Sequence, residues 1–177
     1  TLPREDGSAE FIGYMGNGAK GVNQGLEVEA VLQTTDRLQL TASAGLLDAE
    51  FENYINGSGE DLDGRDQAQA PAYHYYFAAD YRFTQALRLN ISLEGKDDYY
   101  FSDGHAERSP SYAVYNGSLR YSVDAWELSA WGRNLGDKDY FVRGFSFPND
   151  PRDGYTATRW TQLGSPRQFG VTAKVSF

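Results

Sequence analysis

The last ten residues alternate strictly between apolar and polar side chains and end on an aromatic residue. The apolar set is Phe169, Val171, Ala173, Val175 and Phe177, and the polar set is Gln168, Gly170, Thr172, Lys174 and Ser176. Because alternate residues of a strand point to opposite faces, this segment has one face for an apolar environment and one for water. The alternation recurs along the chain, and the connections are alternately short and long. This combination is typical of an up-and-down transmembrane β-barrel, with apolar residues facing lipid and polar residues facing the lumen.

Eight segments carry the alternating pattern and predict an all-β, antiparallel fold in which residues 1–177 form a single barrel region. They are residues 10–15, 22–34, 38–46, 73–83, 87–96, 113–123, 126–133 and 168–177. Short turns at 35–37, 84–86 and 124–125 join neighbouring segments into hairpins. Long polar connections at 52–71, 97–110 and 136–165 read as loops. In an outer-membrane barrel the long loops face outward, so we expect these three to be extracellular.

The composition agrees with a barrel and argues against other classes. No run of about 18 apolar residues exists, which excludes a transmembrane helix. A mean hydropathy of -0.60 does not count against a barrel, since each strand needs only about 10 residues and half of them face inward. The 13 Tyr and 10 Phe suit aromatic girdles at the membrane interfaces. A net charge of -9 argues against a nucleic-acid-binding surface.

Several motifs resemble those of TonB-dependent outer-membrane receptors. Residues 131–140, Trp-Gly-Arg-Asn-Leu-Gly-Asp-Lys-Asp-Tyr, are similar to the Asn-Leu-(Phe/Thr/Gly)-Asp-(Lys)-x-Tyr element near the end of that family. Residues 164–171 resemble its Gly-x-Pro-Arg-x-(Phe/Tyr)-Gly-Val start of the last strand. Residues 21–29 resemble its Gly-(Val/Leu)-Glu-Leu-Glu strand, followed at the usual interval by residues 44–51. Ala70-Pro71 before a strand is a further match, and together the motifs cover most of the chain.

The resemblance implies the C-terminal portion of a 22-stranded receptor barrel, of which eight strands are about a third. Family members have a plug domain in the lumen and a TonB box that couples uptake to the proton-motive force. Since Thr1 is not a start methionine, we expect a fragment or a truncated product without the plug domain or the TonB box. The implied location is the bacterial outer membrane. The implied partners are membrane lipid, the TonB complex through the missing plug, a small-molecule ligand such as a ferric siderophore, and the barrel-assembly machinery, which would read Phe177.

The residues alone leave one alternative open: a free-standing eight-stranded outer-membrane barrel with a structural, adhesion or recognition role. Such a barrel has an interior filled by side chains. Charges of both signs are predicted to face inward, where they suit pairing across a narrow lumen or lining a wide one. They are Glu27, Glu29, Arg82, Arg88, Glu94, Lys96, Arg120, Glu127 and Arg133.

Aromatic and cationic residues in the loops are the candidates for ligand binding. The longest loop mixes both types, which suits an anionic, aromatic ferric siderophore, in Phe145, Phe147, Arg152, Tyr155, Arg159 and Trp160. Tyr99, Tyr100 and Phe101 lie where a strand meets a loop and suit either an interfacial girdle or ligand stacking. The predicted ligand-binding set is Tyr99, Tyr100, Phe145, Arg152, Tyr155, Arg159 and Trp160.

No catalytic or metal-binding constellation is predicted. His74 and His105 lie about thirty residues apart without cysteine or a carboxylate pair in zinc-ligand spacing. The acidic segment 60–66 suggests calcium, but it lacks the bidentate glutamate and the full spacing of a calcium loop, so a solvated loop is the better interpretation. We therefore expect neither an enzyme nor a cofactor.

Overall fold

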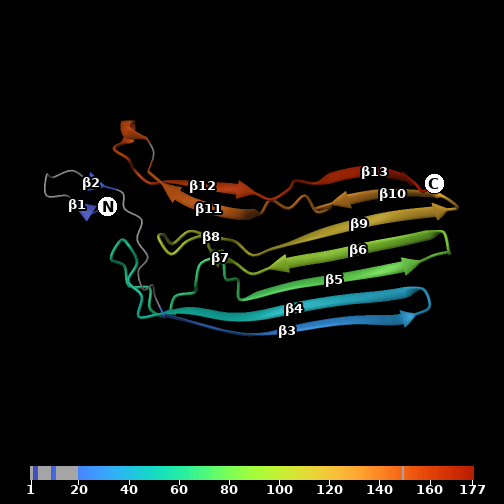
Figure 1. The fold of residues 1–177 in the computed structure, drawn as a ribbon, viewed down its shortest axis with the longest axis horizontal. Coiled ribbons are helices and arrows are strands. Elements are labelled where there is room, and N and C mark those ends of the chain that lie inside the picture. Colours follow the sequence, from blue (N-terminus) through green and yellow to red (C-terminus); the bar gives the residue numbers. More distant parts are fainter. Residues whose placement is uncertain (1, 4–8, 11–19, 149) are drawn as a thin grey trace.

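The structure is a computed structural model that describes residues 2–3, 9–10, 20–148 and 150–177. Its main element is an antiparallel sheet of seven strands in the order β13-β10-β9-β6-β5-β4-β3 (Figure 1). The strands are β3 (Lys20–Thr35), β4 (Leu38–Glu52), β5 (Tyr73–Arg82), β6 (Leu87–Lys96), β9 (Tyr112–Val123), β10 (Trp126–Arg133) and β13 (Gln168–Val175). The predicted all-β, up-and-down fold is confirmed, since each of these strands pairs with its neighbours in chain order.

Two of the long connections contain hairpins, where the sequence predicts loops. The connection after β6 holds β7 (Tyr99–Tyr100) and β8 (Arg108–Ser109), and the one after β10 holds β11 (Phe141–Phe147) and β12 (Thr158–Leu163). A short 3-10 helix, η1 (Pro151–Asp153), lies between β11 and β12. Further, β1 (Leu2–Pro3) pairs with β2 (Ala9–Glu10). Apart from Glu10, the strand predicted at 10–15 lies outside the described residues.

The three predicted short turns lie together with the C-terminus at one end of the sheet, and the two loop hairpins lie at the other end (Figure 1). Threonine side chains stabilise two of the turns. The Thr35 hydroxyl accepts hydrogen bonds from the amides of Arg37 and Leu38, and the Thr84 hydroxyl accepts them from Ala86 and Leu87. These bonds satisfy amides that the strand ladders leave unpaired, which fixes the hairpin register.

The strands are in register, so that each face of the sheet is uniform in character. One row across five strands consists of Leu32, Leu40, Ala79, Ile91 and Gly117. The neighbouring row on the opposite face consists of Gln33, Gln39, Asp80, Asn90 and Ser118. We call these sides the apolar face and the polar face. Because the side-chain period is two, a one-residue slip would exchange the two faces, and the pattern therefore specifies the register.

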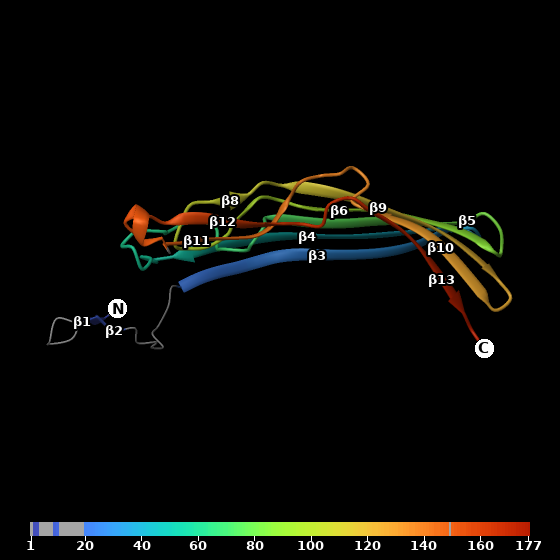
Figure 2. The ribbon, with the colours of Figure 1, turned by 90° about the horizontal axis from the view of Figure 1, so that it is seen from above.

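The sheet is a single curved layer and is not closed within the described residues (Figure 2). Strands β3 and β13 form its two edges. Large side chains of the apolar face remain exposed, including Ile91 at 51 %. No helix among the described residues is long and apolar enough to cross a membrane.

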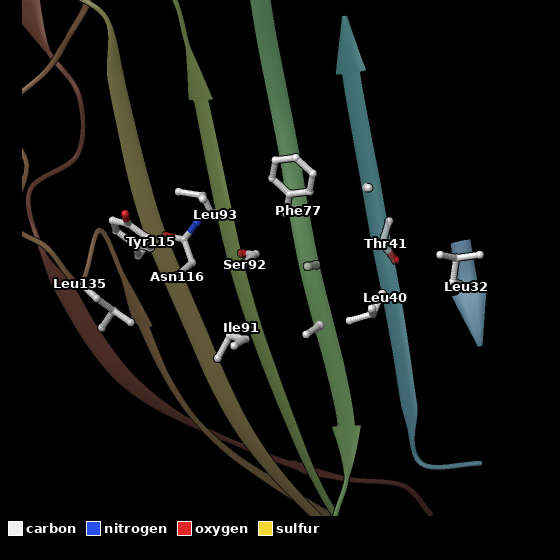
Figure 3. A pocket seen from close by; sticks show the side chains of 13 residues that line it. Leu32, Leu40, Thr41, Phe77, Ile91, Ser92, Leu93, Tyr115, Asn116 and Leu135 are labelled. Carbon is white, nitrogen blue, oxygen red and sulfur yellow. The ribbon is translucent and has the colours of Figure 1, made fainter. Parts of the chain in front are cut away.

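A shallow groove on the apolar face has a volume of about 610 Å³ (Figure 3). Its lining includes Leu32, Leu40, Phe77, Ile91, Tyr115 and Leu135. The Leu135 side chain reaches this face from the residues that follow β10. It lies over two glycines, 3.5 Å from the position that a Cβ of Gly117 would occupy and 2.6 Å from that of Gly132. The missing side chains at these glycines therefore make the space that Leu135 fills.

Asn134 forms the junction between β10 and the longest connection. It is 3 % exposed and has a φ of 47°, a left-handed conformation that asparagine tolerates well. Its side-chain amide donates to the carbonyls of Lys138 (2.9 Å) and Ser165 (3.0 Å), and its Oδ1 accepts from the amide of Lys138. One buried side chain thereby joins the beginning of the connection to its end.

Two further contacts close the same junction. The Asp137 carboxylate accepts a hydrogen bond from the Arg167 amide and forms an ion pair of 3.2 Å with its guanidinium. The ring of Tyr140 covers Gly164, whose amide donates to the Tyr140 carbonyl. The motif residues at 134–140 and 164–167 therefore pair with one another and place β13 beside β10.

Candidate ligand-binding surface at the loop end

The hairpin β7–β8 packs directly against β11. The ring of Phe101 covers Gly144, and an added Cβ there would overlap the ring. The hydroxyls of Tyr99 and Ser109 both donate to the carbonyl of Phe141, at 3.3 and 3.2 Å. The ring of Phe101 also meets that of Phe141 edge to face. These contacts join the connection after β6 to the connection after β10.

The connection after β4 is bound to the same hairpin through polar contacts. The Tyr54 hydroxyl donates to the Asp103 carboxylate at 2.5 Å, and the Asn56 amide donates to the Asp103 carbonyl at 3.0 Å. The hydrogen bond to Asp103 raises the pKa of the Tyr54 phenol above its usual value. Residues 53–72, β7–β8 and β11–β12 therefore form one unit, which we call the loop assembly.

The guanidinium of Arg65 makes a third link within the loop assembly. It donates to the carbonyls of Ser102 (2.7 Å) and His105 (2.9 Å) and lies 3.9 Å from the centre of the Tyr100 ring. Arg108 lies 4.2 Å from the centre of the same ring and pairs with Asp98 and Asp66. Tyr100 therefore contributes to two cation–π contacts within the loop assembly.

Tyr99 is 1 % exposed, and the ammonium of Lys96 lies 4.3 Å from its ring centre. The structure thus places Tyr99 and Tyr100, two of the predicted ligand-binding residues, inside the loop assembly. There they hold the hairpins together.

Three aromatic side chains share one exposed face of the β11–β12 hairpin. Phe145 and Trp160 are directly opposite one another and are 49 % and 46 % exposed, and Phe147 lies two residues along. We call these three residues the aromatic face. Arg143 occupies the same side of β11 and is exposed. The opposite side carries Gly144, which packs under Phe101.

The other predicted residues of this connection lie away from the aromatic face. Arg152 pairs with Asp150 at 2.7 Å, and this contact lowers the pKa of the Asp150 carboxyl below its usual value. Tyr155 lies beyond η1 with a φ of 60° and is exposed. Arg159 is opposite Ser146, on the side of Gly144. The structure therefore brings Phe145 and Trp160 together and keeps Arg152, Tyr155 and Arg159 separate from them.

Arg143 belongs beside the aromatic face but was not among the predicted residues. The signal in the sequence is the alternation of Arg143, Phe145 and Phe147 with Gly144 and Ser146. This pattern resembles a strand, but its larger residues face solvent and its smaller ones face protein. The sequence alone does not show which side of this strand faces protein, because that depends on the packing partner, Phe101.

The acidic residues and histidines have structural contacts. Asp61 accepts a hydrogen bond from the Asp63 amide, and Asp63 accepts one from the Asn53 amide, as in turns. His74 packs on Gly45 within the sheet, and His105 pairs with Glu107 in the β7–β8 hairpin. Among the described residues, no group of three or more His, Cys, Asp or Glu side chains is arranged to hold a metal ion.

The chain matches a protein-family model described as TonB dependent receptor-like, beta-barrel, over residues 3–135. It is 27 % identical over 131 residues to the ferrioxamine receptor of Yersinia enterocolitica, a match that covers 70 % of this chain and 18 % of the relative. The motifs at 21–29, 44–51 and 131–135 thus fall within the residues that the family model matches.

Solved structures share the fold of this chain. The ferric yersiniabactin uptake receptor of Yersinia pestis superimposes with a TM-score of 0.76 at 20 % identity, covering 91 % of this chain and 24 % of the receptor. The siderophore receptor PiuA of Acinetobacter baumannii gives 0.70 at 21 % identity, covering 88 % and 22 %. The chain therefore spans about a fifth to a quarter of these relatives. They are receptors, in agreement with the prediction that the chain is not an enzyme.

Proposed function

Because the chain belongs to the TonB-dependent receptor-like β-barrel family, we propose that residues 1–177 are one barrel region, the C-terminal portion of a bacterial outer-membrane receptor for a ferric chelate. The apolar face would lie against lipid and the polar face would line the lumen. The short-turn end would then be periplasmic and the loop assembly extracellular. TonB would act through parts of the receptor outside this chain.

The observation that carries the proposal is the exposed aromatic face on a rigidly held hairpin. Pre-organised loops bind ligands with a smaller loss of conformational entropy than mobile loops do. Phe145 and Trp160 offer stacking surfaces, and Arg143 offers a positive charge for the carboxylate or phenolate groups of a chelate. Arg152 and Tyr155 would contact a ligand from the tip of the hairpin, and Arg159 would contact it from the other side. Tyr99 and Tyr100 would support the hairpin from within.

The C-terminal Phe177 is fully exposed beyond the end of β13. We propose that Phe177 is recognised by the barrel-assembly machinery, as its resemblance to the family's aromatic assembly signal implies. Its substitution would then lower the amount of receptor in the outer membrane and leave the ligand affinity of the assembled receptor unchanged.

The test is ligand binding by the full-length receptor that carries this segment. Ferrioxamine, ferric yersiniabactin and ferric citrate form a suitable panel, and binding is followed by quenching of tryptophan fluorescence or by calorimetry. Trp160→Ala should weaken binding of the recognised chelate about two- to tenfold, since an aromatic contact is worth about 0.5–1.5 kcal/mol. Trp126→Ala is the matched control, because Trp126 is similarly exposed but lies at the short-turn end. Equal affinity of Trp160→Ala and the unaltered receptor would exclude the aromatic face as the binding surface.

A further inference from the structure

Three arginines line one cleft at the short-turn end of the polar face. Arg82 and Arg88 are directly opposite one another on β5 and β6, and Arg37 lies in the turn after β3, where its carbonyl accepts a hydrogen bond from the Arg82 amide. The cleft has a volume of about 130 Å³, and its other lining residues are Gln33, Gln39 and Asp80. We call it the arginine cleft. It belongs to a chain whose net charge is -9, so the cleft has the opposite sign to the whole.

Carboxylates offset little of the positive charge in the arginine cleft. Of its lining residues only Asp80 is acidic, and the Asp80 carboxylate accepts a hydrogen bond from the Asn90 side-chain amide at 3.1 Å. Within the part of the chain that the structure describes, no Asp or Glu lies within ion-pair distance of Arg37, Arg82 or Arg88. Guanidinium groups stay charged at physiological pH, and like charges directly opposite in a sheet are destabilising. A bound anion would therefore stabilise the cleft.

The next arginine on the same face shows the contrast. Arg120 is directly opposite Arg88 on β9, and its guanidinium lies 3.6 Å from the Glu127 carboxylate on β10. The Arg82 guanidinium instead donates to the Asp36 carbonyl at 3.1 Å. A guanidinium carries five N–H donors, so this one bond holds the side chain and leaves other donors for a ligand.

The spacing and size of the arginine cleft suit an anion with more than one charged group. Neighbouring strands lie about 4.8 Å apart, and each guanidinium can bind a carboxylate or phosphate group through two parallel hydrogen bonds. The volume of the cleft corresponds to about four water molecules at about 30 Å³ each. That is room for a compact small molecule with two such groups, one for Arg82 and one for Arg88.

We propose that the arginine cleft binds a small molecule that carries at least two carboxylate or phosphate groups. The site is separate from the loop assembly, which lies at the opposite end of the sheet (Figure 1). If the polar face lines the lumen, the cleft lies at the periplasmic mouth, where an anionic ferric chelate would leave the receptor. Only this placement rests on the proposed function, because binding depends on the cleft alone.

Arginine modification in the full-length receptor in detergent tests the proposal. Phenylglyoxal reacts with accessible guanidinium groups, and the modified positions are mapped by mass spectrometry. Citrate is the carboxylate probe and pyrophosphate the phosphate probe, with acetate and sodium chloride at the same ionic strength as controls. A saturating probe should slow modification of Arg82 and Arg88 at least about fivefold, because it occupies their N–H groups through charge-assisted hydrogen bonds. Arg133, which is exposed at the other end of the polar face, should react at an unchanged rate.

Protection by citrate, by pyrophosphate or by both supports the proposal and identifies the bound group. Equal rates in both probes and in sodium chloride would overturn it. Acetate that protects as well as citrate would also overturn it, because one carboxylate would then be enough. Arginines that react in none of the buffers would overturn it too, since the rest of the receptor would then close the cleft.

Two variants give an independent readout. Arg88→Gln removes one charge from the arginine cleft and should reduce the protection of Arg82 to less than about twofold. Arg120→Gln removes the neighbouring arginine that is paired with Glu127 and should leave the protection unchanged. Heat-modifiable migration in gel electrophoresis shows that both variants are folded. Full protection of Arg82 in Arg88→Gln would contradict the assigned site. A receptor whose arginine cleft is protected but that binds no ferric chelate would refute the proposed ligand and leave this inference intact.

Discussion

The ring of Phe101 lies directly on the α-carbon of Gly144, and this contact joins two hairpins that are more than forty residues apart in the sequence. No side chain fits at position 144 while the ring stays in place. The hairpin that carries the aromatic face therefore takes its position from β7–β8 and not only from the strands β10 and β13 that it connects.

The first prediction concerns this contact. Gly144→Val should push the Phe101 ring away and destabilise the loop assembly by about 1–3 kcal/mol, the usual cost of overpacking. Hydrogen–deuterium exchange in residues 99–109 and 141–147 of the full-length receptor should become faster. Gly57→Ala is the control, because an added Cβ there meets no atom within 4 Å. Unchanged exchange in Gly144→Val would show that the two hairpins are held independently.

The second prediction concerns Asn134. Asn134→Ala leaves the carbonyls of Lys138 and Ser165 and the amide of Lys138 without their partner, at a cost of about 1–3 kcal/mol for buried groups. Denaturant unfolding of the full-length receptor in detergent measures the loss. Asn134→Asp keeps the acceptor oxygen for the Lys138 amide but places a buried carboxylate oxygen against the carbonyls of Lys138 and Ser165, so it should lose at least as much. Asn23→Ala, at an exposed position of β3, should change little. Equal stability of Asn134→Ala and Asn23→Ala would contradict the assigned role.

The third prediction distinguishes the two faces of the sheet. Ile91→Arg should cost about 2–4 kcal/mol of folding free energy near the bilayer midplane, because the charge must enter lipid. Ser92→Arg places the same charge on the polar face and should be far milder. Folding of the full-length receptor into lipid vesicles, followed by denaturant titration, gives both values. Similar losses for the two variants would contradict the orientation of the sheet.

The fourth prediction concerns the tip of the β11–β12 hairpin. The hydrogen bonds from Arg152 lower the pKa of the Asp150 carboxyl below 3.8. A lowered pKa in the folded state means that the stabilisation of the tip is present above pH about 3.8 and is lost as the pH falls through the folded-state pKa. Carboxyl chemical shifts of the isotopically labelled receptor report this titration, and Arg152→Ala should move the Asp150 pKa back toward 3.8. An Asp150 pKa that does not respond to Arg152→Ala would mean that the pair does not persist in solution.

The sheet was predictable because its strands follow the two-residue period that a sheet with one apolar and one polar face requires. The segment 87–96, with Leu87, Leu89, Ile91 and Leu93 on one side, became β6 with its predicted bounds. The turns were predictable for a local reason, since threonine and aspartate residues specify them within a few positions. The motif residues around Asn134 were recognised by resemblance, and only the structure shows that their hydrogen bonds join the two ends of a connection.

The loop assembly was not predictable, because its contacts join segments far apart in the sequence. Nothing local to Tyr99 indicates that its ring is buried rather than free for a ligand. Whether the Tyr99 ring is buried depends on its contacts with Lys96 and Phe141 and on the space above Gly144. The paired positions of Phe145 and Trp160 likewise depend on the register of a hairpin that encloses η1, and the register shift between Phe141 and Arg143 could not be read from the pattern.

The topology also bears on the order in which the ladders form. Three of the six neighbouring strand pairs in the sheet are joined by short turns and three by long connections, of which residues 134–167 between β10 and β13 are the longest. Closing a longer loop costs more chain entropy, and distant pairings form more slowly than local ones. When β11 and β12 pair first, Phe141 and Leu163 come together and the remaining loop is much shorter. Pairing within the β11–β12 hairpin, which presents the aromatic face, would thus bring β13 to β10. Variants that loosen this hairpin should therefore slow the assembly of the receptor before they lower its affinity for the ligand.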